Sequence, residues 1–394
     1  MTKDSLLASN NPDLSVVIPC LNEEDTMETC LSKLVTVAEK EKFTLEVIVA
    51  DNGSQDSSVK IADSFNVRVV HVSQKGYGAA LMAGIEAASA PLLLMADADD
   101  SYNFLDTPKF FNKLRTGVDL VQGCRLPKGG GTIEKGAMPW SHRYIGNPFF
   151  TFLVRNWFGA PINDVYCGMR AFRKDFYNSL KMRCVGMEFA TEMIIKSANI
   201  GASMKEVAIT LHKDGRIQHP PHLRTIRDGW KTLCFFLLFA PSKLLLLPGL
   251  ILIFLGIFVS FLGISETSIN NITFGAHTSL GASLFILSGY QALLMHSLSL
   301  DISERLSIHR QKKGNDLFRL EDKQWTGISL ISFIIGISLW AKVFFLWQSQ
   351  KFGMLDYAST MKIVIPGTTL ICMAFLTVIF MFFRSWLKVV NNAE

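Results

Sequence analysis

Four long apolar segments near the C-terminal end constrain the fold of this chain more than any other feature. They cover residues 244–264, 276–298, 326–347 and 362–383 of the 394-residue sequence. Each is long enough to cross the roughly 30 Å hydrocarbon core of a bilayer, because an α-helix rises about 1.5 Å per residue. The second segment is the most polar, since it carries Ser, Gln and His. We therefore predict an integral membrane protein whose residues 242–394 form four membrane-spanning helices.

The basic residues between these segments predict the topology. Residues 265–275 contain no Lys or Arg, whereas residues 300–325 contain six, and two more follow the fourth segment. Loops on the cytosolic side are enriched in Lys and Arg. We therefore expect the N-terminal part, the 300–325 loop and the C-terminus to be cytosolic, at a bacterial inner membrane or, as second choice, the endoplasmic reticulum. The basic residues are Arg305, Arg310, Lys312, Lys313, Arg319, Lys323, Arg384 and Lys388.

An amphipathic helix is expected immediately before the first span, at residues 223–241. Apolar and basic residues recur there at spacings of three and four, which places them on two separate stripes of a helix. Such a helix suits the headgroup layer of a membrane, and the alternative is a helix packed on the soluble domain. The stripes are Leu223, Ile226, Trp230, Leu233 and Leu237, and Arg224, Arg227 and Lys231.

Residues 1–222 have the composition of a soluble domain, and about 220 residues are enough for an independent core. Apolar strand patterns alternate with helical ones, which predicts an α/β fold with a mostly parallel sheet covered on both faces. The expected strands are 14–18, which Pro19 should end, 45–50, 66–72, 91–96 and 118–123. The expected helices are 25–41, 55–64, 77–89 and 105–116.

Two features of this domain indicate the cytosol. The first 13 residues are polar, so no cleavable secretory signal is expected. The seven cysteines contain no C-x-x-C pair and are interpreted as free thiols in a reducing compartment. The net charge of +5 is modest, and no nucleic-acid partner is expected.

Acidic residues follow the strand at 91–96. Asp97 and Asp99 stand two residues apart, and Asp100 adds a third carboxyl group. Ligands of open α/β sheets bind beyond the carboxyl ends of the strands. Two carboxylates there can share a hard cation such as Mg²⁺ or Mn²⁺, which can also hold a diphosphate. The alternative is a turn whose acids cap a helix.

Two further strand ends carry polar groups. Asp51 follows the second strand and can accept hydrogen bonds from a base or a ribose, while Gly53 allows a tight turn. Asn22 and Glu23 follow the first strand after Pro19 and can reach a nucleoside or cap the next helix. Each of these motifs alone is as typical of an ordinary turn as of a binding site.

The three motifs together, in this order, resemble the family 2 glycosyltransferases with their GT-A nucleotide-sugar domain. The matching segments include VVIPCLNEE, VIVADNGSQDSS, KGYGAALMAGIEAA and LMADADDSYN. Further segments, QGCR, SHRYIGNPFF, DVYCGMRAFRKD and GMEFATEM, resemble the dolichol- and undecaprenyl-phosphate sugar transferases over residues 14–216. The four spans resemble the multi-span members of that group in topology.

This resemblance implies a role for individual residues. Those expected at the nucleoside are Pro19, Asn22, Glu23 and Asp51, with Gly53 in the turn. Those expected near the rest of the donor are Lys75 and Gly76. Asp97 and Asp99 are expected to hold the metal and the diphosphate, and Arg125 and Arg143 to lie near the acceptor phosphate.

The chain departs from the family pattern in two places. Asp100, Ser101 and Tyr102 stand where many relatives have Leu-Gln-His, so the ligands that accompany Asp97 stay open among Asp99, Asp100 and Ser101. The segment 212–216 replaces an Arg-rich stretch and is expected to cover the donor phosphates.

The implied reaction is transfer of a hexose from a nucleotide-sugar to a polyprenyl phosphate, with inversion at the sugar carbon. A lipid phosphate is anionic near pH 7, so it needs no general base, only cations that bring two anions together. The arginines considered for this are Arg125, which ranks first, Arg143, Arg170 and Arg216. We expect Arg125→Ala to reduce transfer strongly and to leave nucleotide binding nearly intact.

Other functions are weighed against this one. A processive polysaccharide synthase would carry a Q-x-x-R-W motif, which the sequence lacks, and an ATP-driven flippase would carry a P-loop, which it also lacks. A non-catalytic sugar-nucleotide binding protein would not need both Asp97 and Asp99. UDP-glucose is preferred slightly over GDP-mannose as donor, and homo-oligomerisation is left open.

Overall fold

The computed structural model describes residues 11–216, 230, 233–236, 239–269, 272–305 and 320–391. The chain divides into two compact units, Met1–Phe235 and Phe236–Glu394. Most of the amphipathic helix expected at 223–241, and most basic residues of the 300–325 loop, lie outside the described residues.

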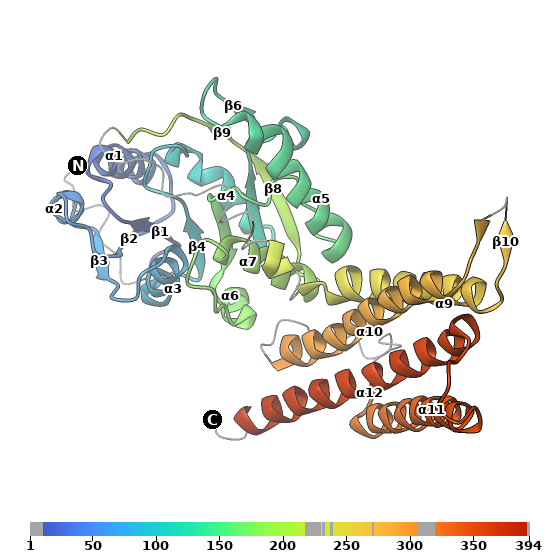
Figure 1. Cartoon of the computed structure of the whole chain (residues 1–394). Helices are drawn as coiled ribbons and strands as arrows, with labels where there is room; N and C mark the ends of the chain where they lie inside the picture. Colours follow the sequence, from blue (N-terminus) through green and yellow to red (C-terminus); the bar gives the residue numbers. More distant parts are fainter. Residues whose placement is uncertain are drawn as a thin grey trace. The chain divides into compact units, whose positions relative to one another are not determined.

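The first unit is built on a mixed seven-stranded sheet (Figure 1). Its strands lie in the order β3-β2-β1-β4-β7-β5-β8, and β7 alone runs antiparallel to its neighbours β4 and β5. The mostly parallel α/β sheet expected from the sequence is confirmed. The strands are β1 (Leu14–Cys20), β2 (Leu45–Asp51), β3 (Arg68–His71), β4 (Leu92–Met95), β5 (Leu120–Cys124), β7 (Arg170–Arg173) and β8 (Met204–Ala208).

Helices cover both faces of this sheet. Leu14, Val16 and Ile18 of β1 pack in one apolar cluster with residues of α1, whereas the intervening Val17 meets Gly84 of α3. A side chain at Gly84 would place its Cβ 2.5 Å from Val17, so helix and strand approach each other closely only because this residue is glycine. The helices are α1 (Glu24–Lys40), α2 (Ser58–Ser64), α3 (Tyr77–Ala87), α4 (Thr107–Leu114), α5 (Asn147–Phe158), α6 (Lys174–Leu180) and α7 (Phe189–Asn199).

The first strand differs from the expectation at its end. We expected Pro19 to end it, but β1 continues to Cys20, and Pro19 pairs with Ala50 of β2. The pairing of β1 with β4 stops at Val17. Beyond that point β1 therefore has a neighbouring strand on one side only, where a residue without an N–H group is tolerated.

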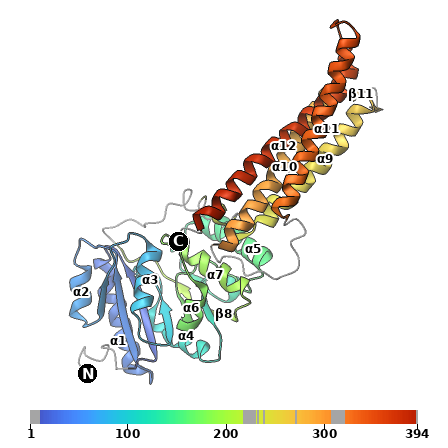
Figure 2. The same ribbon diagram turned by 90° about the horizontal axis from the view of Figure 1, so that it is seen from below.

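The second unit consists of long apolar helices (Figure 2). Four described helices are long and apolar enough to cross a membrane, in the four places that the sequence predicted. They are α9 (Leu247–Ile264), which continues a short π-helix at Ser242–Leu246, α10 (Ala276–Arg305), α11 (Asp322–Ser349) and α12 (Tyr357–Asn391).

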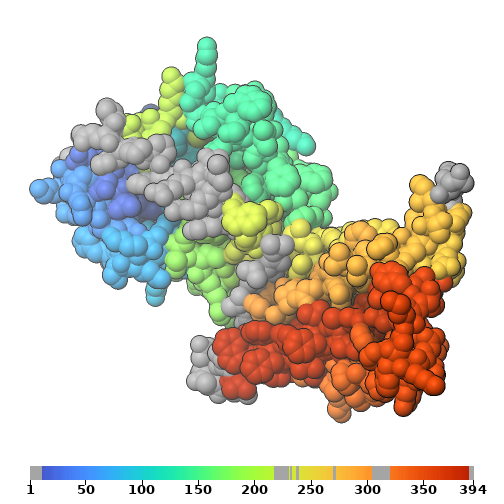
Figure 3. Space-filling view, viewed as in Figure 1, coloured from blue at the N-terminus to red at the C-terminus, as the bar shows by residue number. Residues whose placement is uncertain are grey.

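Small residues bring these helices together, and they lie in direct contact in the space-filling view (Figure 3). A Cβ added at Gly256 of α9 would lie 2.9 Å from the carbonyl oxygen of Ala282 in α10. One added at Gly336 of α11 would lie 2.8 Å from the carbonyl oxygen of Gly367 in α12. Close backbone approach at glycine is the usual way to pack helices in lipid, where apolar burial gives no driving force.

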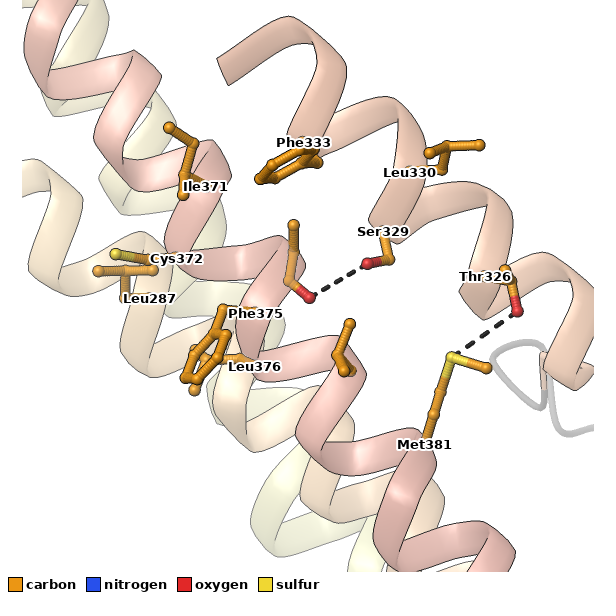
Figure 4. A pocket seen from close by; sticks show the side chains of 12 residues that line it. Leu287, Thr326, Ser329, Leu330, Phe333, Ile371, Cys372, Phe375, Leu376 and Met381 are labelled. Carbon is orange, nitrogen blue, oxygen red and sulfur yellow. Dashed lines mark hydrogen bonds between the residues drawn. The ribbon is translucent and has the colours of Figure 1, made fainter. Parts of the chain in front are cut away.

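One cavity of the second unit lies beside α11 and α12 (Figure 4). Its volume is about 790 Å³, and its lining is almost entirely apolar, with Leu287 contributed by α10. Its two hydroxyl groups are already bonded, since Ser329 donates to the carbonyl of Ala374 at 3.1 Å and Thr326 donates to the sulfur of Met381 at 3.7 Å. This cavity has no group suited to sugar transfer.

Candidate active site

The acidic motifs meet at one edge of the sheet. Strands β1, β2 and β4 run parallel, and Cys20 pairs with Asp51 while Val17 pairs with Met95. The carboxyl ends of these strands therefore lie side by side, as the sequence predicted. The residues that follow them form three neighbouring groups, centred on Asp51, Asp97 and Asp99.

Asp51 is the centre of a preorganised polar turn. Its carboxylate accepts a hydrogen bond of 2.9 Å from the backbone of Ser54, and His71 Nδ1 lies 3.2 Å from it. Burial raises the pKa of Asp51, but the bonds from Ser54 and His71 outweigh burial and hold that pKa below its usual value. Asn22, with a φ of +58°, accepts from the backbone of Gln55 at 2.8 Å. An ionised carboxylate held in place is suited to bind the N–H or O–H groups of a nucleoside.

Asn52 connects this turn to the start of α3, a role that the sequence analysis did not assign. The side-chain oxygen of Asn52 accepts a hydrogen bond from the backbone N–H of Gly76 at 2.7 Å. Lys75 Nζ donates a hydrogen bond to the backbone carbonyl of Asn52 at 2.6 Å. Gly76 has a φ of +139°, and a Cβ there would lie 2.2 Å from the carbonyl oxygen of Val185. Gly53 has a φ of +90°. The positive φ values at Gly53 and Gly76 favour glycine at both positions, and these two residues place Lys75 beside the polar turn.

Asp97 is held by a tyrosine that the sequence analysis also missed. Tyr77, in the first turn of α3, donates to Asp97 Oδ1 at 2.8 Å. A Cβ at Gly168 would lie 2.4 Å from Asp97 Oδ2, so only glycine leaves room there. Burial, together with the negative charge of Asp99, raises the pKa of Asp97 to about 6. The site therefore disfavours a second negative charge unless a cation is present.

Asp99 and Asp100 point to different partners. Asp99 accepts from the hydroxyl of Ser101 at 2.7 Å, and burial raises its pKa. Asp100 has a φ of +58° and pairs with Lys33 of α1 at 2.6 Å. The geometry thus favours Asp99 over Asp100 as the partner of Asp97, because the charge of Asp99 acts on Asp97 whereas Asp100 is paired with Lys33.

Glu23, which we expected at the nucleoside, has its side chain among these acids. Its carboxylate is buried, with Oε1 3.3 Å from Arg216 and with no hydrogen-bond partner for Oε2 among the described residues. Burial, and the negative charges of Asp99 and Asp97, raise its pKa to about 8, although Arg216 opposes that rise.

The segment 212–216 crosses this group of acids. The backbone of His212 donates to the carbonyl of Ser101, and that of Gly215 donates to the carbonyl of Asp99, each at 2.9 Å. The guanidinium of Arg216 consequently lies 3.7 Å from Asp99 Oδ2.

Arg125 differs from the expectation that ranked it first among the phosphate ligands. It is buried and forms a bidentate pair with Asp164, with distances of 2.7 and 2.8 Å. Burial opposes its charge, but the carboxylate of Asp164 outweighs burial and holds the pKa of Arg125 well above its usual value. Its third nitrogen lies 3.4 Å from the hydroxyl of Tyr102, which in turn accepts from the backbone of Gly168 at 2.8 Å. This arginine is therefore engaged inside the protein and is suited to hold the backbone beside Asp97.

Arg170 is also an internal residue. It is fully buried and donates to the carbonyls of Ala190 and Cys167, each at 2.8 Å. It therefore braces β7 against α7 and has no surface for a phosphate.

Arg143 remains available. It lies in a π-helical turn, His142–Gly146, directly before α5, and its guanidinium stacks over Tyr144 at 5.3 Å. It forms no ion pair with a described residue. Large apolar side chains are exposed around it, which is unusual for a surface in water. They are Trp140, Tyr144, Ile145, Phe149 and Phe152.

The donor atoms fit a hard divalent cation. Asp97 and Asp99 supply carboxylate oxygens, which Mg²⁺ and Mn²⁺ prefer, and Asp97 forms no ion pair within the described part of the chain. Among the described residues, no group of three or more His, Cys, Asp or Glu side chains is arranged so that it could hold a metal ion by itself. The two acids therefore suit a cation that takes its remaining ligands from a diphosphate and from water.

A GT-A-like sheet with acids at its strand ends, on a chain with four apolar helices, defines a membrane glycosyltransferase. The chain belongs to glycosyltransferase family 2: residues 15–180 match the model "Glycosyl transferase family 2", and residues 307–388 match "Glycosyltransferase family 2 C-terminal transmembrane region".

The chain is similar in sequence to two relatives and in structure to one solved protein that we compare with it here. It is 31% identical over 379 residues to the low-salt glycan biosynthesis hexosyltransferase Agl6 of Haloferax volcanii, covering 92% of this chain and 89% of the relative. It is 32% identical over 197 residues to a dolichyl-phosphate hexose transferase of the same organism, covering 50% of this chain and 82% of that one. Glucosyl-3-phosphoglycerate synthase from Mycobacterium tuberculosis, solved with Mn²⁺ and UDP, aligns at 20% identity with a TM-score of 0.44, covering 57% and 79% of the two chains.

Proposed function

We propose that this enzyme transfers a hexose from a nucleotide-sugar to a polyprenyl phosphate on the cytosolic side of a membrane. The observation that carries this proposal is the pair Asp97 and Asp99, held beside the polar turn of Asp51 at one edge of the sheet. A dolichyl-phosphate hexose transferase among the relatives, and four helices able to span a membrane, support a lipid-linked acceptor.

The nucleotide-sugar binds across the ends of β1, β2 and β4 in this proposal. Asp51 and Asn22 bind the nucleoside, because their oxygens are already oriented by backbone N–H groups of the 51–55 turn. Lys75 lies beside Gly53 and faces the same turn, where its ammonium can bind a phosphate oxygen.

Asp97 and Asp99 hold Mg²⁺ or Mn²⁺ together with the donor diphosphate. When bound, such a cation neutralises the charge that develops on the departing nucleoside diphosphate. Tyr77 keeps Asp97 oriented, and Ser101 does the same for Asp99. Arg216, at the end of the 212–216 segment, supplies a further positive charge over the same phosphates.

The acceptor approaches from the side of Arg143. Exposed aromatic residues of α5 and of the preceding turn suit contact with a lipid surface, where Trp and Tyr are typically enriched. Arg143 binds the lipid phosphate, while Arg125 acts as a positioning residue through Asp164 and Tyr102. Consequently Arg125→Ala should disturb the backbone beside Asp97, and with it donor binding, which is the opposite of the expectation from the sequence.

The reaction needs no proton transfer by the protein. An oxygen of the lipid phosphate attacks the anomeric carbon, the bond from that carbon to the diphosphate breaks, and the nucleoside diphosphate leaves with the electron pair. Attack opposite the leaving group inverts the configuration at this carbon. The residues of the chain therefore position two anions and balance their charge.

A donor panel tests the proposal. Purified enzyme is incubated with radiolabelled UDP-glucose or GDP-mannose and a polyprenyl phosphate, and the organic phase is analysed for a product that mild acid cleaves. We expect such a product, preferentially from UDP-glucose, and roughly 10³-fold less of it from the Asp97→Asn variant. A labelled polymer in the aqueous phase would indicate a polysaccharide synthase instead, and donor binding without transfer to lipid would indicate a binding protein.

A further inference from the structure

Arg216 has an unusual set of partners at the end of the 212–216 segment. Its guanidinium pairs with Asp214 at 2.5 Å, lies 3.3 Å from Glu23 and lies 3.7 Å from Asp99. Its side chain is only 8% exposed, so these contacts are made in a largely dehydrated place. The bidentate geometry with Asp214 holds the guanidinium in one orientation.

This guanidinium neutralises a concentration of negative charge. Glu23, Asp97 and Asp99 face the same region, and burial raises the pKa of each above its usual value. The negative charge of Asp99 adds to this rise for Glu23 and Asp97, and the negative charge of Asp214 adds to it for Asp99. Among the described residues, Arg216 is the one cation that forms an ion pair with Glu23 or with Asp99. Buried carboxylates without a cation are costly, so this contact stabilises the site in the absence of ligands.

The segment holds Arg216 there through its backbone. His212 and Gly215 bond to the carbonyls of Ser101 and Asp99, and Leu211 forms a β-bridge with Tyr102. These bonds fix the path of the chain next to Asp99 and do not involve the side chain of Arg216. A change of rotamer would move the guanidinium without unfolding the segment.

We propose that Arg216 is an internal counter-ion that takes the place of the divalent cation beside Asp99 and Glu23 until the donor binds. This inference rests on the proposed function, because it assigns a second state to the same metal–diphosphate site. A guanidinium in contact with Asp99 Oδ2 and a cation coordinated by Asp99 compete for the same carboxylate. Arg216 must therefore leave Asp99 when metal and donor arrive, and the diphosphate then provides its new anionic partner.

The two states predict opposite effects of removing this side chain. Without nucleotide, Arg216→Ala removes a competitor, so Mn²⁺ should bind more tightly. The Mn²⁺ affinity should increase about tenfold if Arg216 is paired with Asp99 in roughly nine of ten wild-type molecules. With Mn²⁺ present, the same variant lacks a phosphate ligand, so UDP should bind several-fold more weakly. Wild-type enzyme should bind Mn²⁺ alone weakly and Mn²⁺ with UDP tightly.

The experiment measures Mn²⁺ binding to the full-length enzyme in detergent at pH 7.5, from the electron paramagnetic resonance signal of free Mn²⁺. Arg216→Gln, which keeps a polar side chain of similar length, accompanies Arg216→Ala in case the smaller residue disturbs folding. The melting temperature of each variant shows whether it is folded.

Two control variants separate direct competition from other effects. Arg173 forms a bidentate pair with Asp175, which has the same spacing as the pair of Arg216 with Asp214 but does not touch the acids. Lys75 lies near the site but donates to the carbonyl of Asn52. Arg173→Ala should leave Mn²⁺ affinity unchanged, and Lys75→Ala should change it far less than Arg216→Ala does.

The results distinguish failure of the counter-ion role from failure of the proposed function. Mn²⁺ binding that depends on Asp99 but is unchanged or weakened in both Arg216 variants would overturn the counter-ion role alone. An equal increase in Lys75→Ala would overturn it as well, since the effect would then be general electrostatics. Absence of Mn²⁺ binding in every variant would overturn the inference together with the metal site of the proposed function.

Discussion

The two units of this protein differ in how their buried charges are balanced. In the second unit, Arg384 of α12 lies 2.6 Å from Asp301 of α10 and 2.9 Å from Asp322 of α11, and it donates to the carbonyl of Leu320 at 3.1 Å. In the first unit, the acids at the strand ends outnumber their cations, and one oxygen of Glu23 has no partner among the described residues.

The difference separates a structural use of charge from a chemical one. In the second unit the charge of Arg384 is balanced by carboxylates, and its ion pairs connect α10, α11 and α12 near their ends. A group of carboxylates with too little positive charge favours binding of a cation. Buried carboxylates and arginines therefore stabilise the fold in the second unit, whereas in the first unit they favour ligand binding. Four experiments test this difference.

The largest effect is expected at Asp97. Asp97→Asn keeps the shape of the side chain but removes its charge, so transfer should fall by roughly 10³-fold, the order of magnitude of a lost electrostatic contact in a transition state. Initial rates with saturating donor measure this, and Asp175→Asn on the exposed surface serves as control. Full activity in a folded Asp97→Asn enzyme would contradict the chemical role of the acid group.

The second effect tests the buried pair of the helical unit. Arg384→Met should lower the free energy of unfolding by about 3 kcal/mol, because it removes the guanidinium that pairs with the buried carboxylate of Asp301. Thermal unfolding in detergent, followed by tryptophan fluorescence, measures the change. The double variant with Asp301→Asn should recover part of the loss, and a double variant less stable than Arg384→Met would contradict this account.

The third effect concerns pH. Glu23 and Asp97 hold protons more tightly in the folded state than in the unfolded state, with pKa values of about 8 and about 6. Without metal, their contribution to stability is thus complete below pH 4 and is lost as the pH rises through 6 and 8. The melting temperature of the first unit should fall between pH 5 and pH 9, and Mn²⁺ should restore it at the upper end.

The matched variant for this pH dependence is Glu23→Gln combined with Asp97→Asn. It has no carboxyl groups to titrate at these positions, so its melting temperature should vary less over the same range. A wild-type melting temperature that increased from pH 5 to pH 8 would show that the acids are already balanced by cations, as they are in the helical unit.

The same contrast explains which features the sequence could predict. The spans and strands follow from hydrophobic patterns within each segment, and the parallel register then brings Asp51, Asp97 and Asp99 to one edge. These inferences need only local periodicity and one rule about parallel sheets.

The partners of the charged residues could not be predicted in this way. Arg125 meets Asp164 from 39 positions away, and Glu23 meets Arg216 across 193 positions. Asp100 turns toward Lys33 because of a backbone φ of +58°, which no neighbouring residue signals. Whether an arginine binds substrate or a buried carboxylate depends on such long-range packing, so the first-ranked arginine proved to be internal.

The smallest effect is expected at the edge of the buried network in the helical unit. Lys388 pairs with Asp322, but the two side chains are 49% and 45% exposed, so water and salt screen their attraction. Lys388→Ala should therefore lower the free energy of unfolding by only about 0.5 kcal/mol, in the same detergent assay used for Arg384→Met. A loss as large as that of Arg384→Met would mean that exposed and buried members of the network contribute alike, and burial would then not be what distinguishes the structural charges of this protein.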